Sequence, residues 1–233
     1  MNFLEYLSLI NLLEFLAAIS GTYYVSKTRK KTIVRKFVWF LWLTVFVEIV
    51  ANYASVAYYS DYTYFSFVEN TPFEANYWLY NIYSIIAFGV YITFFTVYLK
   101  NPRLRKILHT ATLIYLIAAV INLFLSDEFF KAYAIFTFFA GTVLVTFSIG
   151  AYYFELLRSD RILNFYKLVP FYISVGALVY HLAFVPLVIY SRYFNAENPE
   201  FIEIYMNILL GINYFLYSIY ILGFLICSRK RKI

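Results

Sequence analysis

The sequence predicts an all-α fold: one membrane domain over residues 1–233, built as a polytopic bundle of seven transmembrane helices. Composition is the first observation behind this prediction, because hydrophobic residues make up 63% of the chain and charged residues only 14%, whereas soluble domains have about half and about a quarter. The second is a series of seven apolar runs, each near the roughly 20 residues that cross a bilayer. The third is the placement of Lys and Arg in alternate gaps between the runs.

The seven runs leave little of the chain over. They lie near residues 3–25, 37–58, 77–99, 107–125, 129–157, 168–190 and 204–227. The first has no basic segment before it and is followed by basic residues from Lys27 to Lys36. A cleavable signal peptide has the opposite order, so we expect this helix to stay in the mature chain. Each later run is bounded by charged residues, and the gap 60–76 should lie on the outer interface or cover a cavity.

The basic residues predict the orientation of the bundle. Seventeen of the 19 Lys and Arg residues fall in the first, third and fifth gaps and in the C-terminal tail, and only Lys131, at the edge of the fourth gap, and Arg192, in the sixth, lie elsewhere. Short loops rich in Lys and Arg stay cytoplasmic, so the N-terminus should be outside and the C-terminus cytoplasmic. These cations flank apolar runs, where orientation and contact with membrane lipid account for the net charge of +6. We therefore expect no nucleic-acid partner.

Ionisable side chains near mid-membrane are the strongest functional signal. Glu14 and Glu48 fall at the middle of the first and second runs, His181 lies close to the middle of the sixth, and Asn213 lies at a similar level in the seventh. Such groups are costly in lipid and usually face a protein interior or a wet cavity. We expect these four helices to present them at one depth.

The amides suggest a cavity that is entered from outside, because every Asn within a run lies in the outer half of its helix. The candidate ligand- or proton-binding residues are Glu14, Glu48, Asn52, His181, Asn213, Asn81, Asn122 and Tyr217. We expect a polar funnel that closes at the level of Glu14 and Glu48. The alternative is that the amides only hydrogen-bond between helices, at about 1 kcal/mol each. For His181, a hydrogen-bonded core position is the simpler interpretation.

The charges inside the bundle limit the ligand. Two carboxyls close together in a low dielectric do not both ionise easily, so Glu14 and Glu48 should share a proton. No Lys or Arg lies inside the runs near them, which disfavours an anionic substrate. Aromatic walls beside a carboxylate suit an amine, and they also suit a neutral or lipid-like molecule.

Catalysis and metal binding have little support in the sequence. A lone Cys227 excludes an internal disulfide and a multi-cysteine metal site, and the two histidines do not form a recognised ligand pattern. We expect no cofactor, no metal and no catalytic residue. No stretch is left for a soluble catalytic or DNA-binding domain, so a signal sent inward would need a separate cytoplasmic or membrane partner.

In length, short loops and aromatic-rich helices, with 26 Tyr and 26 Phe, the chain resembles the small stand-alone seven-helix membrane proteins of bacteria and the seven-helix sensory modules that precede histidine kinases. This resemblance covers the whole chain, is architectural, and carries no functional residue over. It implies a multi-pass protein of the bacterial inner membrane. Our interpretation is a receptor-like sensor that binds a small amine, neutral or lipid-like ligand. A proton- or cation-coupled transporter that uses Glu14 and Glu48, and a non-binding assembly subunit, remain as alternatives.

Overall fold

The computed structural model describes residues 3–28, 32–191 and 199–229, and all regular elements within them are helical. The α-helices are α1 (Phe3–Lys27), α2 (Thr32–Tyr59), α3 (Tyr77–Thr96), α4 (Pro102–Leu125), α5 (Glu128–Lys131), α6 (Ile135–Leu157), α7 (Val169–Tyr190) and α8 (Pro199–Ser228). Two 3-10 segments are η1 (Ser66–Val68) and η2 (Asp160–Lys167). The predicted all-α class is confirmed. Of the basic residues that predicted the orientation, those at 29–31, 192 and 230–232 lie outside the described residues.

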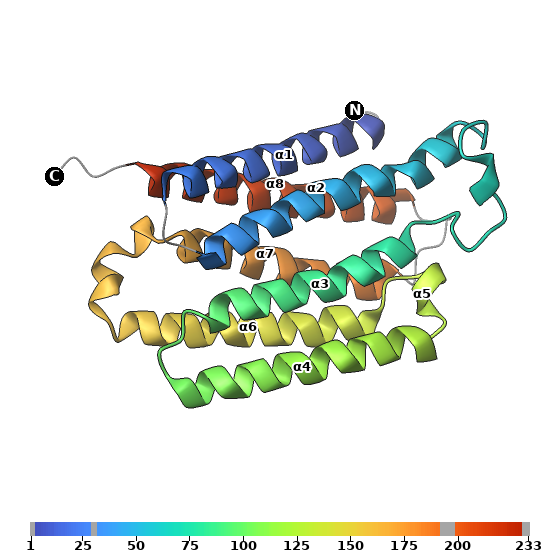
Figure 1. The fold of residues 1–233 in the computed structure, drawn as a ribbon. Coiled ribbons are helices and arrows are strands. Elements are labelled where there is room, and N and C mark those ends of the chain that lie inside the picture. Colours follow the sequence, from blue (N-terminus) through green and yellow to red (C-terminus); the bar gives the residue numbers. More distant parts are fainter. Residues whose placement is uncertain (1–2, 29–31, 192–198, 230–233) are drawn as a thin grey trace.

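The long helices lie side by side and alternate in direction (Figure 1). In the described part of the chain, six of them, α1, α3, α4, α6, α7 and α8, are long and apolar enough to cross a membrane. This is the architecture of a multi-pass membrane protein. The 28-residue helix α2 runs alongside them. Helix α1 starts at the end of the bundle that carries the 60–76 segment, and α8 finishes at the opposite end (Figure 1).

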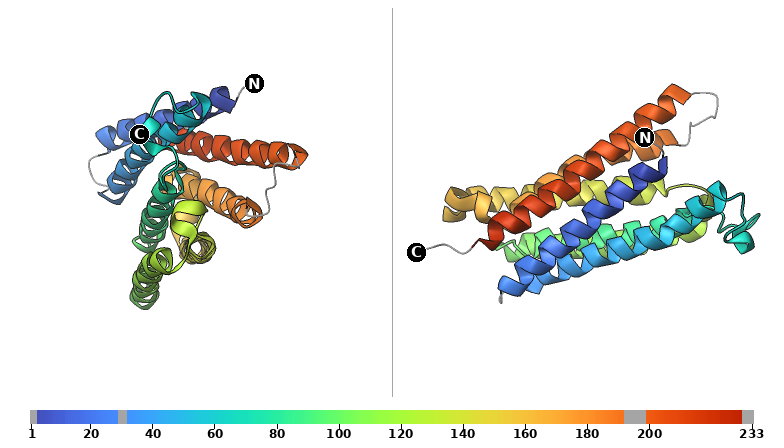
Figure 2. Two further views of the ribbon diagram at one scale, coloured as in Figure 1. Left: turned by 90° about the vertical axis from the view of Figure 1, so that its right-hand side faces the viewer. Right: turned by 90° about the horizontal axis from the view of Figure 1, so that it is seen from above.

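Six of the helices close into a ring. The contacts run in the order α1, α2, α3, α6, α7, α8 and back to α1, and α4 packs outside the ring against α3 and α6. The end-on view in Figure 2 shows α4 at the edge of the bundle. The interior of the ring is therefore reached by side chains of six helices, whereas α4 lies behind two of them.

The outer surface of the bundle is strongly apolar. Phe124 and Leu125 at the end of α4 are 85% and 82% exposed, and Trp39 on α2 is 71% exposed. A soluble protein rarely shows extended patches of this kind. Lipid is the environment in which such a surface is stable.

Close approach between the helices depends on small residues, as is usual in membrane bundles. At Gly141 of α6 an added Cβ would lie 2.4 Å from the ring of Phe88 on α3. At Gly223 of α8 it would lie 2.4 Å from Tyr172 on α7. These two glycines let large aromatic side chains pack directly against the neighbouring backbone.

The run expected as one helix over 129–157 is divided in the structure. The single turn α5 ends at Lys131, and α6 starts only at Ile135. Between them Ala132 is fully extended, with φ −159° and ψ 169°. The continuous helix expected from residue 129 is thus not formed, although all its residues are compatible with one.

Asn81 of α3, whose side chain is fully buried, bonds to the backbone on both sides of this break. Its Nδ2 donates to the carbonyl oxygens of Phe129 at 3.2 Å and Ala132 at 2.9 Å. Its Oδ1 accepts from the backbone N–H of Ala134 at 2.9 Å. One amide from a neighbouring helix therefore replaces backbone hydrogen bonds that a continuous helix would have made.

Candidate functional site

A cavity of about 170 Å³ lies inside the ring. Its polar lining consists of Asn11, Glu14, Thr44, Glu48, Ser84, His181 and Asn213, and its phenols are Tyr80, Tyr83, Tyr91, Tyr133, Tyr180 and Tyr217. All six ring helices contribute lining residues and α4 contributes none. Glu14, Glu48, Ser84, His181 and Asn213 lie near the middle of their helices or toward the end that faces the 60–76 segment, whereas Tyr91 and Tyr217 lie several residues past the middle on the opposite side. The cavity therefore lies around the middle of the bundle, where the sequence analysis placed Glu14, Glu48, His181 and Asn213.

The two carboxyl groups come from adjacent helices. Glu14 on α1 is only 3% exposed, and its Oε2 has no hydrogen-bond partner among the described residues. Its carboxyl lies within hydrogen-bonding reach of the Tyr217 hydroxyl and close enough to Glu48 for their charges to interact. Glu48 on α2 is half-buried and accepts a hydrogen bond of 2.7 Å from the hydroxyl of Tyr80 on α3. Each acid is thus paired with a phenol, and both face one space.

His181 on α7 lies beside the acids in the cavity wall and is 6% exposed. Its ring centroid is 4.9 Å from that of Phe88 and 5.1 Å from that of Tyr91. Its Nε2 is buried and has no hydrogen-bond partner among the described residues. The sequence predicted a hydrogen-bonded core position for His181. The structure shows a buried position, but without a hydrogen bond at Nε2.

Asn213 on α8 also lines the cavity, at 9% exposure. Its Nδ2 donates to the carbonyl oxygen of Leu209 one turn earlier, at 2.8 Å. One of the two N–H donors of this amide is thus used within its own helix.

Aromatic side chains form most of the remaining wall. Tyr83 stacks on Phe40 with ring centroids 5.9 Å apart, and its hydroxyl is 2.7 Å from that of Thr44. On the other side Tyr180 stacks on Phe184 at 5.3 Å. These contacts orient the Tyr83 and Tyr180 rings in the wall.

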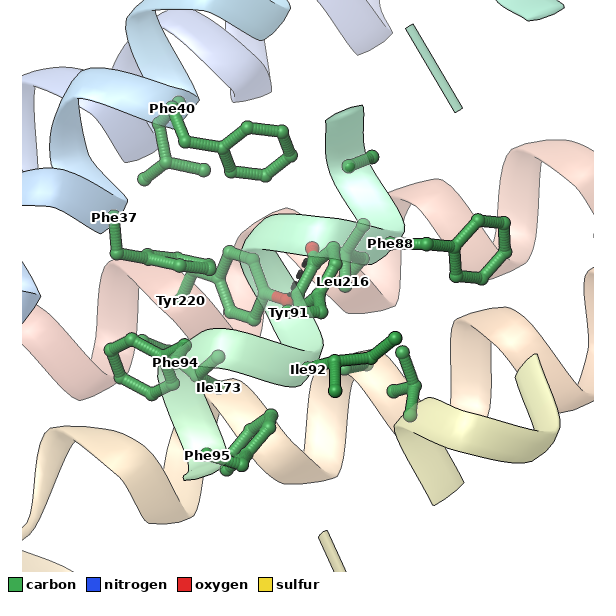
Figure 3. Packing of buried hydrophobic residues seen from close by; sticks show 14 of the residues in the cluster. Phe37, Phe40, Phe88, Tyr91, Ile92, Phe94, Phe95, Ile173, Leu216 and Tyr220 are labelled. Atoms are coloured by element: carbon green, nitrogen blue, oxygen red, sulfur yellow. Dashed lines mark hydrogen bonds between the residues drawn. The ribbon is translucent and has the colours of Figure 1, made fainter. Parts of the chain in front are cut away.

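Toward the end of the bundle where α8 finishes, the cavity has a packed floor. Figure 3 shows this cluster, in which the hydroxyls of Tyr91 and Tyr220 are joined by a 2.9 Å hydrogen bond. The residues packed around that pair and at most 2% exposed are Phe37, Phe94, Phe95, Ile173 and Phe224. The described side chains packed around this hydroxyl pair are apolar.

The 60–76 segment does not line the cavity. It packs instead on the outer part of α2, where the Tyr53 hydroxyl donates to the carbonyl oxygen of Phe73 at 2.6 Å. Within the segment the Tyr62 hydroxyl donates to Glu74 at 2.5 Å. This hydrogen bond raises the pKa of Tyr62 to about 12. The sequence left two positions open for this segment, at the outer interface or over a cavity. The structure places it at the end of the bundle, and it does not line the cavity.

Five of the eight predicted site residues meet in the cavity: Glu14, Glu48, His181, Asn213 and Tyr217. Three do not. Asn52 lines a separate apolar groove beside Phe67 and Trp78, Asn81 holds the α5–α6 break, and Asn122 lies on the peripheral helix α4. The Oδ1 of Asn122 is buried and has no hydrogen-bond partner among the described residues.

Tyr133 is a cavity residue that the sequence reasoning missed. It lies in the break between α5 and α6, where a continuous helix was expected. A signal was present, because Asp127, Glu128 and Lys131 place three charges within five residues. Charges at that density mark the end of a membrane span rather than its first turn.

The fold and the site define a helical protein of the multi-pass membrane type with a central acidic and aromatic cavity. Over the residues that the structure describes, no group of three or more His, Cys, Asp or Glu side chains is arranged to hold a metal ion. Comparisons with protein-family models, with curated proteins and with solved structures found no significant match.

Proposed function

We propose that this chain is a receptor-like membrane protein that binds a small organic cation in the central cavity and signals through a separate partner. One observation carries the proposal: two carboxyl groups, each beside a phenol, meet in a small space walled mainly by aromatic rings. Among the residues that the structure describes, no Lys or Arg lines this cavity. Beyond a proton shared between the two acids, the charge that remains on them is compensated only by a ligand that brings its own positive charge.

The chemistry of the wall favours an amine or a quaternary ammonium over a metal ion. Aromatic faces attract such cations, by about 0.5 to 2 kcal/mol per ring depending on solvation. The volume of about 170 Å³ corresponds to roughly five or six water molecules at about 30 Å³ each. It is below the roughly 300 Å³ at which drug-sized pockets begin. The ligand is therefore a compact cation such as a short alkylammonium.

The packed floor supports binding over conduction. The end of the bundle where α8 finishes carries Lys27, Lys100 and Arg161, and we call it the basic end. The Tyr91–Tyr220 pair and the aromatic residues around it separate the cavity from this end. A bound cation would change the contacts of all six ring helices at once, because each of them supplies lining residues. Such a change can reach the basic end through rigid helices, where a partner would detect it.

The membrane arrangement is part of the same proposal. We take α2 as the seventh span, because its 28 residues measure about 42 Å at roughly 1.5 Å per residue and it completes the ring. We place the 60–76 segment outside and the basic end in the cytoplasm of a bacterial cell, as the distribution of Lys and Arg favours.

Cysteine labelling tests this orientation. In a Cys227→Ala background, Ser66→Cys in η1 is expected to react with a membrane-impermeant maleimide in intact cells. Asp160→Cys in η2 is expected to react only after the cells are permeabilised. Both residues are exposed and lie at opposite ends of the bundle, so the reverse labelling pattern would refute the orientation.

Ligand-dependent thermal unfolding of the purified full chain tests the binding function. The probes are methylammonium, tetramethylammonium, tetraethylammonium and tetrabutylammonium chlorides, each compared with NaCl at the same ionic strength. We expect the smaller ions to raise Tm and tetrabutylammonium to leave it unchanged. A cation at about 100 times its Kd stabilises by about 2.7 kcal/mol.

Charge-neutral variants complete this test. Glu14→Gln and Glu48→Gln are each expected to reduce the cation-dependent rise in Tm by more than half. Glu69→Gln is the matched control, because Glu69 is exposed in the 60–76 segment and does not line the cavity. The proposal fails if no small cation stabilises the protein beyond NaCl, or if all three variants respond alike.

A second function is a proton- or cation-coupled transporter. The pairing of two nearby acids with phenols favours it, because such groups can hold and pass a proton. Flux across the membrane of proteoliposomes separates the two. Flux driven by a proton gradient that disappears in Glu48→Gln would favour transport, whereas cation binding without flux favours the receptor.

A further inference from the structure

We propose that the basic end of the bundle holds a second binding site, for the phosphate group of an anionic phospholipid. A pocket of about 560 Å³ lies there between the α3–α4 connection, the last turns of α6 and η2. Its side chains include Tyr98, Lys100, Tyr152 and Arg161, and none of its residues lines the central cavity. This site is therefore independent of the proposed receptor function.

Two phenols form the inner wall of the pocket. Tyr152 of α6 is 5% exposed, and its ring centroid is 6.0 Å from that of Tyr98. The hydroxyls of both residues are buried and have no hydrogen-bond partner among the described residues. An unsatisfied buried hydroxyl costs about 1 to 3 kcal/mol, and native proteins leave few of them. Two neighbouring donors without an acceptor indicate a ligand that supplies acceptor oxygens.

Cations stand at the mouth of the same pocket. The Arg161 guanidinium lies close enough to both phenols for its positive charge to act on them. Lys100 and Arg161 are both exposed and line the pocket. Two hydroxyl donors, a guanidinium and an ammonium are the donor set that binds phosphate oxygens.

Glu155 also lines the pocket, and its carboxylate has another role. Its oxygens accept from the backbone N–H of Lys100 at 2.5 Å and of Asn101 at 3.0 Å. The carboxylate thus anchors the α3–α4 connection to α6 and leaves the phenols and cations to face the ligand.

The surroundings of the pocket favour a lipid as the source of the phosphate. Val97, which lines the pocket, and Leu157, at the end of α6, are 45% and 67% exposed. They provide apolar surface for acyl chains beside the polar donors. Basic pockets between helices at the cytoplasmic side are a recurring type of site for anionic headgroups.

Thermal unfolding of the purified full chain with added lipid tests the site. Dioleoylphosphatidylglycerol is expected to raise Tm more than dioleoylphosphatidylcholine. Arg161→Gln and the double variant Tyr98→Phe–Tyr152→Phe are each expected to reduce this difference by at least half. Without lipid, the double variant should be as stable as the wild type or more stable, because it removes two unsatisfied hydroxyls and little volume.

Matched controls separate a built site from general attraction. Arg105→Gln and Lys106→Gln remove exposed cations at the same end that do not line the pocket, and both should keep the full response. The proposal is overturned if they lose as much of it as Arg161→Gln, or if the double Phe variant keeps it. Inorganic phosphate at matched ionic strength should stabilise less than the lipid. Stabilisation by phosphate but not by phosphatidylglycerol would overturn the lipid assignment.

Discussion

Asn81→Leu is expected to lower the free energy of unfolding by about 3 to 5 kcal/mol, the upper end of what single substitutions cost. Leu fills nearly the same volume but offers no hydrogen bonds. It would leave the carbonyl oxygens of Phe129 and Ala132 and the N–H of Ala134 without the partner they have now. Each unsatisfied buried group costs about 1 to 3 kcal/mol, and lipid offers no replacement.

Chemical or thermal unfolding in detergent measures this effect, and Asn52→Leu is its control. Asn52 has the same chemistry and lies in the same half of the bundle, but it lines a groove that is almost entirely apolar. We expect its replacement to change stability by less than about 1 kcal/mol. If the two substitutions cost the same, the hydrogen bonds of Asn81 do not hold the break between α5 and α6.

The Asn81 contacts also explain how Tyr133 reaches the cavity. They hold the residues on either side of it, Ala132 and Ala134. Between these two fixed points the Tyr133 ring packs against Tyr80 at 6.2 Å and Phe138 at 5.7 Å. Asn81 was predicted to bind a ligand, and the structure gives it the different task of positioning a wall residue. Those two tasks look identical in a sequence, because both need a buried amide in the outer half of a helix.

The sequence was sufficient to predict the all-α class and several of the side chains that line the cavity. Glu14, Glu48 and His181 are too costly to place against lipid, so their positions along the helices specify both where the interior is and how deep the polar layer lies. The structure agrees with that layer, because all three line one cavity. The cost of an ionisable side chain in lipid depends only on its position along its own helix, so it can be assessed from the sequence of that helix.

The same argument could not tell which helices enclose the cavity. Asn122 was placed in the site on the assumption that all seven helices face one interior, yet α4 packs behind α3 and α6. The loops from α3 to α4 and from α4 to α5 are short, which predicts that consecutive helices are antiparallel neighbours. Many different arrangements of the helices meet that condition. The order of helices around the ring depends on side-chain packing between distant segments, such as Gly141 against Phe88. Local sequence patterns do not contain that information.

The second large effect concerns Glu14, the more deeply buried of the two acids. The double variant Glu14→Leu–Tyr217→Phe is expected to raise the stability of the ligand-free protein by about 1 to 3 kcal/mol and to abolish cation binding. Glu14 is 3% exposed with one carboxyl oxygen unpartnered, and burial of such a group is unfavourable. Replacing both members of a hydrogen-bonded pair by apolar groups of similar shape is often neutral or stabilising, whereas removing one member leaves the other unsatisfied. For a chain of this length about 2 kcal/mol corresponds to a rise of roughly 4 to 8 °C in Tm.

The matched control is Glu48→Leu–Tyr80→Phe, the same pair of changes at the half-buried acid. Glu48 already has its hydrogen bond from Tyr80 at 2.7 Å and is less deeply buried than Glu14, so its removal should gain less stability while also abolishing binding. A gain confined to the Glu14 variant would mean that the fold carries a destabilising acid at the one position where a cation can compensate it. That is the exchange of stability for function expected at a binding site. A loss of more than about 1 kcal/mol in the Glu14 variant would instead make the acid structural, and the carboxyl groups would no longer support a cation receptor.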